Sequence, residues 1–129
     1  HEPVSVLLEP AGKTLALVSY GRETADALDA CALLSEYGPA LFKLNRVSPL
    51  PDGLHSLLRE YRYVVAVEES MRAGGVGERL AALLSDTPAV VKTVAVDGFV
   101  EHGAPALLRA RLGLDGPGIA GFCMRECKL

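Results

Sequence analysis

The stretch VVAVEESMRAGGVGERL, residues 64–80, joins an uncharged run, two adjacent carboxylates, a glycine cluster and an amphipathic segment. The uncharged run is typical of a strand that is buried on both faces of a parallel sheet. The glycines predict a sharp loop, and the segment after them has the period of a helix. Open α/β sheets usually place their chemistry where such a strand ends and such a helix begins.

Further segments of the same two kinds alternate along the chain. Strands are expected at residues 14–20, 41–46, 63–68 and 90–96, and helical period is present at residues 27–34, 54–61 and 76–84. This alternation predicts βαβ units, and hence a parallel sheet with helices on both faces. Residues 4–8 are expected to add a short edge strand.

Capping and breaking residues refine the helix boundaries. Asp52 is expected to cap the second helix, and Gly38 with Pro39 to end the first. A further helix is expected from about Pro105 to Leu112, with Gly113 ending it. A final helix should begin after Asp115 and run through Ile119, Phe122 and Cys123.

Length and composition indicate a single globular domain over residues 1–129. The chain is 50% hydrophobic and 22% charged, its net charge is -3, and it has no Trp. These values favour a well-buried core and disfavour nucleic-acid binding. No apolar run is long enough to span a bilayer, and the N-terminus lacks the features of a signal peptide. It also lacks an initiator Met, so we expect a piece of a longer protein.

The three cysteines show no framework spacing, which favours a reducing cytoplasm. Cys31 lies in an apolar helical pattern and is expected to be a small buried side chain. Cys123 and Cys127 are four residues apart, with no His close to them in sequence. Two thiols alone make a poor zinc site, so no metal site is expected.

Glycines 74, 75 and 77 do not form a nucleotide-binding motif. Their spacing is not that of G-x-G-x-x-G, and no G-x-x-x-x-G-K-[ST] occurs in the sequence. Two interpretations of Gly74, Gly75 and Gly77 remain. The helix start could hold an anion through free backbone N–H groups, or the glycines could permit a tight loop and close packing.

The carboxylates Glu68 and Glu69 should point to opposite faces of a strand and do not form an acid–base pair. One of them could accept hydrogen bonds from the glycine loop, or pair with an arginine. Gly21 and Arg22 follow the first long strand and could form a second anion contact, although a solvated arginine is an equal alternative. His102 is expected at a helix start, as a cap or interface residue more than a base.

Five segments together resemble the C-terminal domain of the transketolase superfamily of thiamine-diphosphate enzymes, most of all in the 1-deoxy-D-xylulose-5-phosphate synthase family. The segments occur in the family's order and span much of the chain: VSYGRETADALDA (18–30), NRVSPLPDGL (45–54), VEESMRAGGVGE (67–78), GFVEHG (98–103) and GLDGPGIA (113–120). The resemblance implies a three-layer α/β/α domain. Its five-stranded sheet would be mostly parallel, with the first strand antiparallel.

The resemblance also implies a function for the longer enzyme. That enzyme would condense pyruvate with glyceraldehyde 3-phosphate for isoprenoid, thiamine and pyridoxal synthesis, as a cytoplasmic homodimer with thiamine diphosphate and magnesium. The family's GDG…N cofactor segment is absent from this sequence. We therefore expect this chain to hold no cofactor, to have no catalytic residue, and to support domain and dimer packing.

Two alternatives remain open. The chain could be the docking domain of a 2-oxoacid dehydrogenase β-subunit, which shares the first three segments. It could also be a small-anion regulatory module that uses the helix starts at Arg22 and Gly75.

Overall fold

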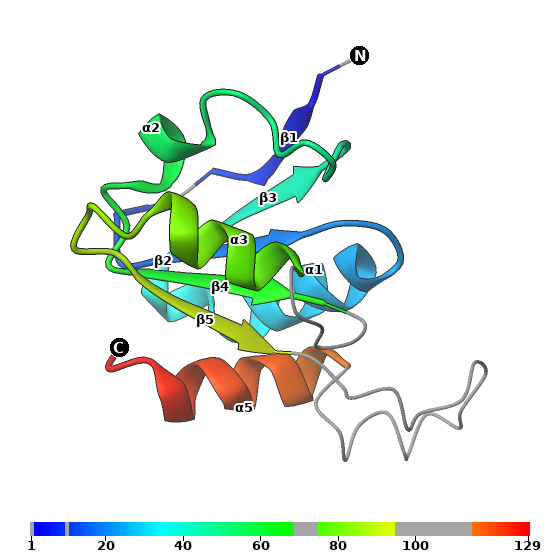
Figure 1. The fold of residues 1–129 in the computed structure, drawn as a ribbon. Helices are drawn as coiled ribbons and strands as arrows, with labels where there is room; N and C mark the ends of the chain where they lie inside the picture. Colours follow the sequence, from blue (N-terminus) through cyan, green and yellow to red (C-terminus); the bar gives the residue numbers. More distant parts are fainter. Residues whose placement is uncertain (1, 10, 69–74, 95–114) are drawn as a thin grey trace.

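The computed structural model describes residues 2–9, 11–68, 75–94 and 115–129, and its centre is a five-stranded sheet (Figure 1). The strands lie in the order β1-β3-β2-β4-β5. Strand β1 pairs antiparallel with β3, and the remaining pairs are parallel. The predicted sheet with an antiparallel first strand is therefore confirmed. The strand bounds are β1 Val4–Leu8, β2 Leu15–Ser19, β3 Ala40–Leu44, β4 Tyr63–Val67 and β5 Val90–Val94.

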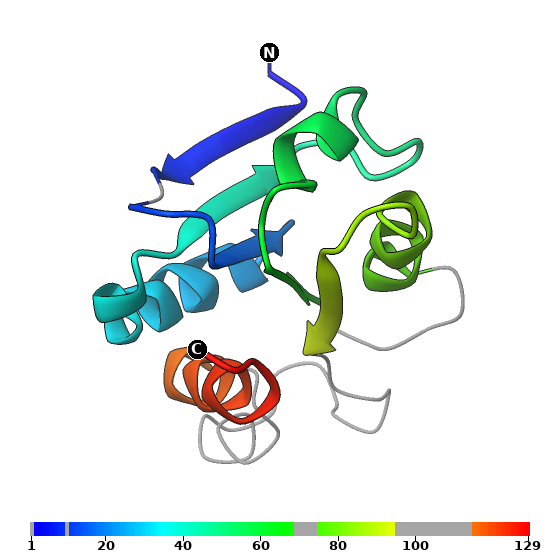
Figure 2. The ribbon, with the colours of Figure 1, turned by 90° about the vertical axis from the view of Figure 1, so that its left-hand side faces the viewer.

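Helices cover both faces of this sheet, as Figure 2 shows. Helices α1 and α5 pack on one face, and α2 and α3 pack on the other. The three-layer arrangement expected from the sequence is thus confirmed. The helix bounds are α1 Glu23–Leu33, α2 Leu54–Leu58, α3 Val76–Leu83 and α5 Gly116–Glu126, and a 3₁₀ turn, η1, covers Ser35–Tyr37.

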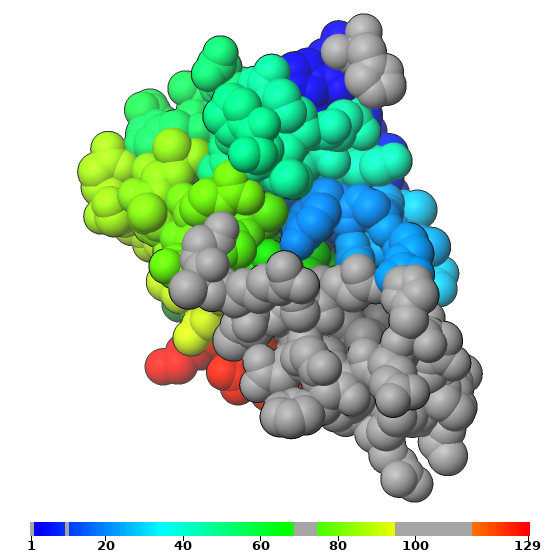
Figure 3. Space-filling model, turned by 45° about the vertical axis from the view of Figure 1, so that its right-hand side comes forward, coloured from blue at the N-terminus to red at the C-terminus, as the bar shows by residue number. Residues whose placement is uncertain are grey.

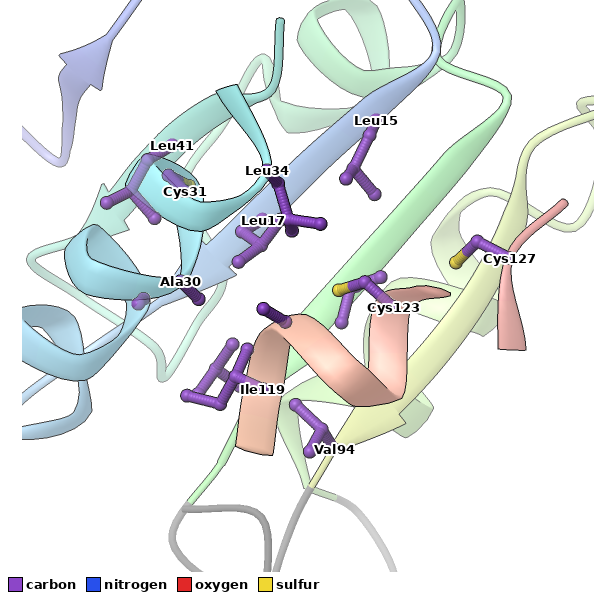
Figure 4. Packing of buried hydrophobic residues seen from close by; sticks show 14 of the residues in the cluster. Leu15, Leu17, Ala30, Cys31, Leu34, Leu41, Val94, Ile119, Cys123 and Cys127 are labelled. Carbon is purple, nitrogen blue, oxygen red and sulfur yellow. The ribbon is translucent and has the colours of Figure 1, made fainter. Parts of the chain in front are cut away.

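The central strands are uncharged because they contact apolar layers on both sides. In β2, Leu15 and Leu17 face the α1–α5 layer, whereas Ala16 and Val18 face the α2–α3 layer. All four are fully buried, and β4 alternates in the same way. Figure 4 shows the α1–α5 side, where side chains of β2, α1 and α5 meet. Successive strand residues point to opposite faces, so a strand between two apolar layers needs an apolar residue at every position.

The direction of the crossovers reverses between β2 and β4. From β2 the chain passes through α1 to β3 on one side, and from β4 it passes through α3 to β5 on the other. The two strands are direct neighbours, with Val18 opposite Ala66. Their carboxyl ends therefore form the topological switch point, where open α/β sheets usually bind ligands.

Two helix starts show how far capping signals can be trusted. The prediction that Asp52 caps α2 is wrong: Gly53 is the residue before the helix, and no side chain caps it. Gly53 has a φ of 87°, which turns the chain between Asp52 and the first helical residue. At α5 the expected start is confirmed, since Asp115 Oδ1 accepts a hydrogen bond of 2.8 Å from Gly118 N. The helix expected from Pro105 to Leu112 lies outside the described residues.

Candidate functional site

A buried carboxylate joins three elements at the switch point. Glu68 directly follows β4, and only 3% of it is exposed. Its Oε1 accepts hydrogen bonds from Val76 N at 2.9 Å and from the Tyr20 hydroxyl at 3.1 Å. Its Oε2 accepts a hydrogen bond from Gly77 N at 2.9 Å. The carboxylate thus links the end of β4 to the start of α3 and to the residue after β2.

The position of Glu68 follows from the electrostatics of the helix start. The first N–H groups of a helix have no partner within the helix, and the dipole makes that end positive. Val76 and Gly77 are the first two residues of α3, so their N–H groups belong to this set. A buried carboxylate is costly unless it is hydrogen-bonded, and three donors satisfy Glu68 here.

Glycine at position 77 allows α3 to lie close to the sheet. A Cβ placed on Gly77 would lie 2.0 Å from Thr93 Oγ1 in β5 and 3.0 Å from Glu68 Oε2. Real Cβ atoms do not approach other atoms so closely, so any larger residue would displace α3 or Thr93. Gly75 precedes the helix in an extended conformation. Of the two interpretations of the glycine cluster, the geometry at Gly77 fits close packing.

The turn from β2 to α1 forms the other side of the switch point. Gly21 adopts a φ of 69°, and Arg22, which is exposed, precedes α1. Glu23, the first residue of α1, is only 6% exposed, and Ser19 Oγ lies 3.0 Å from Thr24 Oγ1 in a buried hydrogen bond. Figure 3 shows this turn, in blue, on the same face of the molecule as α3, in green.

The structure therefore brings together part of the predicted site. Glu68, Gly75 and Gly77 form one junction, and Tyr20 connects this junction to the turn that holds Gly21 and Arg22. The other predicted residues, Glu69, Gly74 and His102, lie outside the described residues.

Sequence reasoning missed Tyr20 and Thr93, which complete the junction. Tyr20 follows an uncharged strand, and an aromatic ring with a polar tip at such a position is a signal that could have been used. Nothing in the sequence marks Thr93, because its role depends on the distance between α3 and β5.

Arg79, also missed, extends from α3 to the loop after β3. Its Nη1 donates a hydrogen bond to the backbone oxygen of Val47. Within the same loop, Arg46 Nε donates to Pro49 O at 3.2 Å. Both arginines thus donate hydrogen bonds to backbone oxygens of the loop that follows β3.

The three cysteines lie in the core between the sheet and the α1–α5 layer. All are buried and none forms a disulfide. Burial raises the pKa of Cys31 and of Cys123 to about 12, and it also raises the pKa of Cys127. Thiols with a raised pKa are poor nucleophiles and poor metal ligands. Within the described ranges, no group of three or more His, Cys, Asp or Glu side chains is placed to bind a metal ion.

Two observations away from the switch point concern the helices and the surface. In the part of the chain that the structure describes, no helix has both the length and the apolar character needed to cross a membrane. On the surface, His55 Nε2 of α2 lies 2.9 Å from Asp86 Oδ1, and this hydrogen bond lowers the pKa of Asp86. The pair lies at the surface and away from the switch-point residues in sequence, so it is a surface contact between α2 and the turn after α3.

The chain is similar to proteins that are named for one enzyme. A 1-deoxy-D-xylulose-5-phosphate synthase of Dehalococcoides mccartyi (strain CBDB1) is 39% identical over 117 residues, which cover 84% of this chain and 18% of that protein. The synthase of Caldanaerobacter subterraneus subsp. tengcongensis is 33% identical over 95% of this chain and 20% of its own length. The chain thus spans about a fifth of the length of these relatives.

Solved structures agree on the fold. A split-gene transketolase, described as an inactive beta4 tetramer, superposes with a TM-score of 0.79 at 25% identity, over 97% of this chain and 43% of that one. A transketolase from Campylobacter jejuni gives a TM-score of 0.70 at 15% identity, over 95% of this chain and 18% of that one. The family model described as "Transketolase, C-terminal domain" matches residues 5–119. This chain therefore belongs to the transketolase C-terminal domain family.

Proposed function

We propose that this chain is the C-terminal, non-catalytic domain of a 1-deoxy-D-xylulose-5-phosphate synthase, in a single domain over residues 1–129. The observation that carries the proposal is the 39% identity to a synthase over 84% of the chain. The longer enzyme would condense pyruvate with glyceraldehyde 3-phosphate, using thiamine diphosphate and magnesium. The domain would pack on the cofactor-binding domains of its own chain and support a homodimer in the cytoplasm.

The chemistry of the described residues supports a structural role. Glu68 is the buried carboxylate of the switch point, and each of its oxygens already accepts hydrogen bonds from the protein. The buried thiols have a raised pKa and lie in an apolar core. A general base or a nucleophile must instead reach a substrate in the correct ionisation state.

The synthase relatives favour this proposal over a docking domain of a 2-oxoacid dehydrogenase β-subunit, since both named relatives are synthases. The two candidates differ in what should precede the chain in its reading frame. A synthase should carry a GDG…N cofactor segment several hundred residues upstream in the same polypeptide. A β-subunit should lack that segment and should bind an acyltransferase partner.

The experiment is an assay of two polypeptides, this 129-residue chain and the product of its complete reading frame. Each is incubated with pyruvate, glyceraldehyde 3-phosphate, thiamine diphosphate and magnesium, and release of carbon dioxide and formation of the sugar phosphate are measured. We expect activity from the complete product and none from the chain alone. A complete product without a GDG…N segment and without activity would reduce the proposal to a statement about fold.

A further inference from the structure

The positive end of α3 lies at the position where open α/β sheets commonly bind a phosphate or carboxylate ligand. In this chain a carboxylate of the protein itself lies there. We propose that Glu68 is a built-in anion that fills the N-terminal end of α3, and that it thereby excludes phosphate and other small anions from the switch point.

Hydrogen-bond occupancy is the first support. The backbone N–H groups of Val76 and Gly77 both donate to Glu68, one to each carboxylate oxygen. An incoming phosphate would need these same donors. The hydroxyl of Tyr20, the residue after β2, adds a third bond, which fixes the carboxylate in place. Because the Glu68 side chain is buried, its displacement would also break a packed junction.

Charge is the second support. The α1 helix, which begins at the other side of the switch point, also starts with a buried acidic residue, Glu23. Each of the two helix starts at this edge of the sheet therefore carries its own carboxylate. A carboxylate near a helix N-terminus compensates the positive dipole. The edge thus offers an added anion little attraction, although Arg22, the residue before α1, is an exposed cation there.

Space is the third support. Gly77 lies so close to the sheet that an added Cβ would meet Thr93 Oγ1 at 2.0 Å and Glu68 Oε2 at 3.0 Å. Glu68 and Thr93 thus both lie close to Gly77. A phosphate ion is larger than a methyl group, so among the described residues the gap between Gly77 and Thr93 has no room for one.

The direct test is a titration of the wild-type chain with inorganic phosphate, followed by NMR. The amide signals of Val76 and Gly77 should show no saturable shift beyond that caused by sodium chloride of equal ionic strength. A saturable shift of these two amides would overturn the proposal, because it would mean that the helix start accepts an anion while Glu68 is present.

A variant test asks whether the site appears when the carboxylate is removed. Glu68→Ala leaves a cavity and two unpaired N–H groups, so we expect the melting midpoint to fall by roughly 5–15 °C. Sodium formate, which supplies a small carboxylate, should raise that midpoint more than sodium chloride does, with a saturable shift of the Val76 and Gly77 amides. A folded Glu68→Ala chain that does not respond to formate would contradict the proposal.

Two controls separate this effect from general salt effects. Glu68→Gln keeps the volume of the side chain, so formate should not stabilise it beyond chloride. Glu60→Ala removes an exposed glutamate and should behave like the wild type. If Glu68→Ala does not fold, the phosphate titration of the wild type still decides the question, and stabilisation of the wild type by formate beyond that by chloride would count against a filled site.

Discussion

The two helical layers of this domain are attached to the same sheet in different ways. The α1–α5 layer meets the sheet mainly through apolar side chains, such as Leu17 and Ile119, and through buried thiols, such as Cys31 (Figure 4). A single buried hydrogen bond, between Ser19 Oγ and Thr24 Oγ1, links β2 to α1 among the bonds described above. The α2–α3 layer has a comparable apolar cluster, but α3 is also fixed by the hydrogen bonds of Glu68. Burial therefore holds both layers, whereas a buried carboxylate with three hydrogen bonds positions the start of α3.

The difference teaches what each layer can tolerate. Apolar contacts are non-directional, so a layer held mainly by them can adjust by small shifts when a side chain changes. A hydrogen-bonded carboxylate with a close backbone contact allows little adjustment, because both partners have fixed directions. We expect the stability lost on substitution in the α1–α5 layer to scale with the side-chain volume removed. At the start of α3 we expect the loss to depend on whether the hydrogen bonds and the close contact at Gly77 are kept.

The largest effect should come from truncation of a core side chain. Ile119 in α5 and Leu80 in α3 are both fully buried, one in each layer. Ile119→Ala and Leu80→Ala should each lower the free energy of unfolding by about 2–5 kcal/mol, through lost burial and the cavity left behind. Urea unfolding followed by circular dichroism measures both values. If Ile119→Ala cost less than an exposed substitution such as Met124→Ala, α5 would not be part of the core.

The next effect should come from adding a single methyl group at the α3 start. Gly77→Ala places a Cβ against Thr93 Oγ1 and Glu68 Oε2, so we expect a loss of about 1–3 kcal/mol from overpacking. In the Thr93→Ala background, which removes the nearest contact atom, the same substitution should cost less. Gly121→Ala in α5 is a matched control, since its added Cβ would meet only the end of the Arg125 side chain, at 3.2 Å. Equal costs at both glycines would remove the distinction between the layers.

A third effect is a loss of stability at high pH that comes from the buried thiols of the α1–α5 layer. Burial raises the pKa of Cys31 and Cys123 from 9.0 to about 12, so between these values the folded chain keeps protons that the unfolded chain releases. The free energy of unfolding should therefore fall as the pH rises above 9.0, by about 1.4 kcal/mol per pH unit for each thiol. Unfolding curves at increasing pH measure the slope of the free energy of unfolding against pH. Cys123→Ala should reduce that slope by the contribution of one thiol. An unchanged slope in that variant would show that Cys123 ionises as easily in the folded state as in the unfolded one.

The smallest effect should come from the cap of α5. Asp115 accepts a hydrogen bond from Gly118 N, so Asp115→Ala should lower the free energy of unfolding by about 1 kcal/mol. Asp115→Asn, which keeps a capping oxygen, should recover most of this loss. Thermal unfolding of the three chains measures the series. A loss in Asp115→Asn as large as that in Asp115→Ala would point to the charge and not to the cap.

Much of the fold could be predicted from local patterns. Strand β4 is apolar at every position, and β2 at every position but its last, Ser19, because both of their faces are covered, and this leaves a signal in the sequence. The antiparallel first strand came from the family resemblance, since a short edge strand carries little pattern of its own. Asp52 was misread because a capping side chain and a turn residue look alike in sequence, and the conformation of Gly53 decides between them.

The candidate site was predictable only in part. The sequence placed Glu68 and the glycines near one another, because a strand end and the following helix start are close along the chain. It did not show that Tyr20, which follows a strand far away in sequence, donates to the same carboxylate. Nor did it show whether the first N–H groups of α3 are open to a ligand or already bonded to Glu68.

The sequence by itself determined the alternation of buried strands and amphipathic helices, because burial on both faces requires apolar residues at every strand position. It also determined the family, through ordered segments spread over most of the chain. Only the tertiary structure decided that β2 and β4 are neighbours, that Gly77 contacts Thr93, and that Glu68 occupies the end of α3. The physical reason is that these contacts depend on how separate elements pack together, and distances between packed elements leave no periodic pattern along the chain.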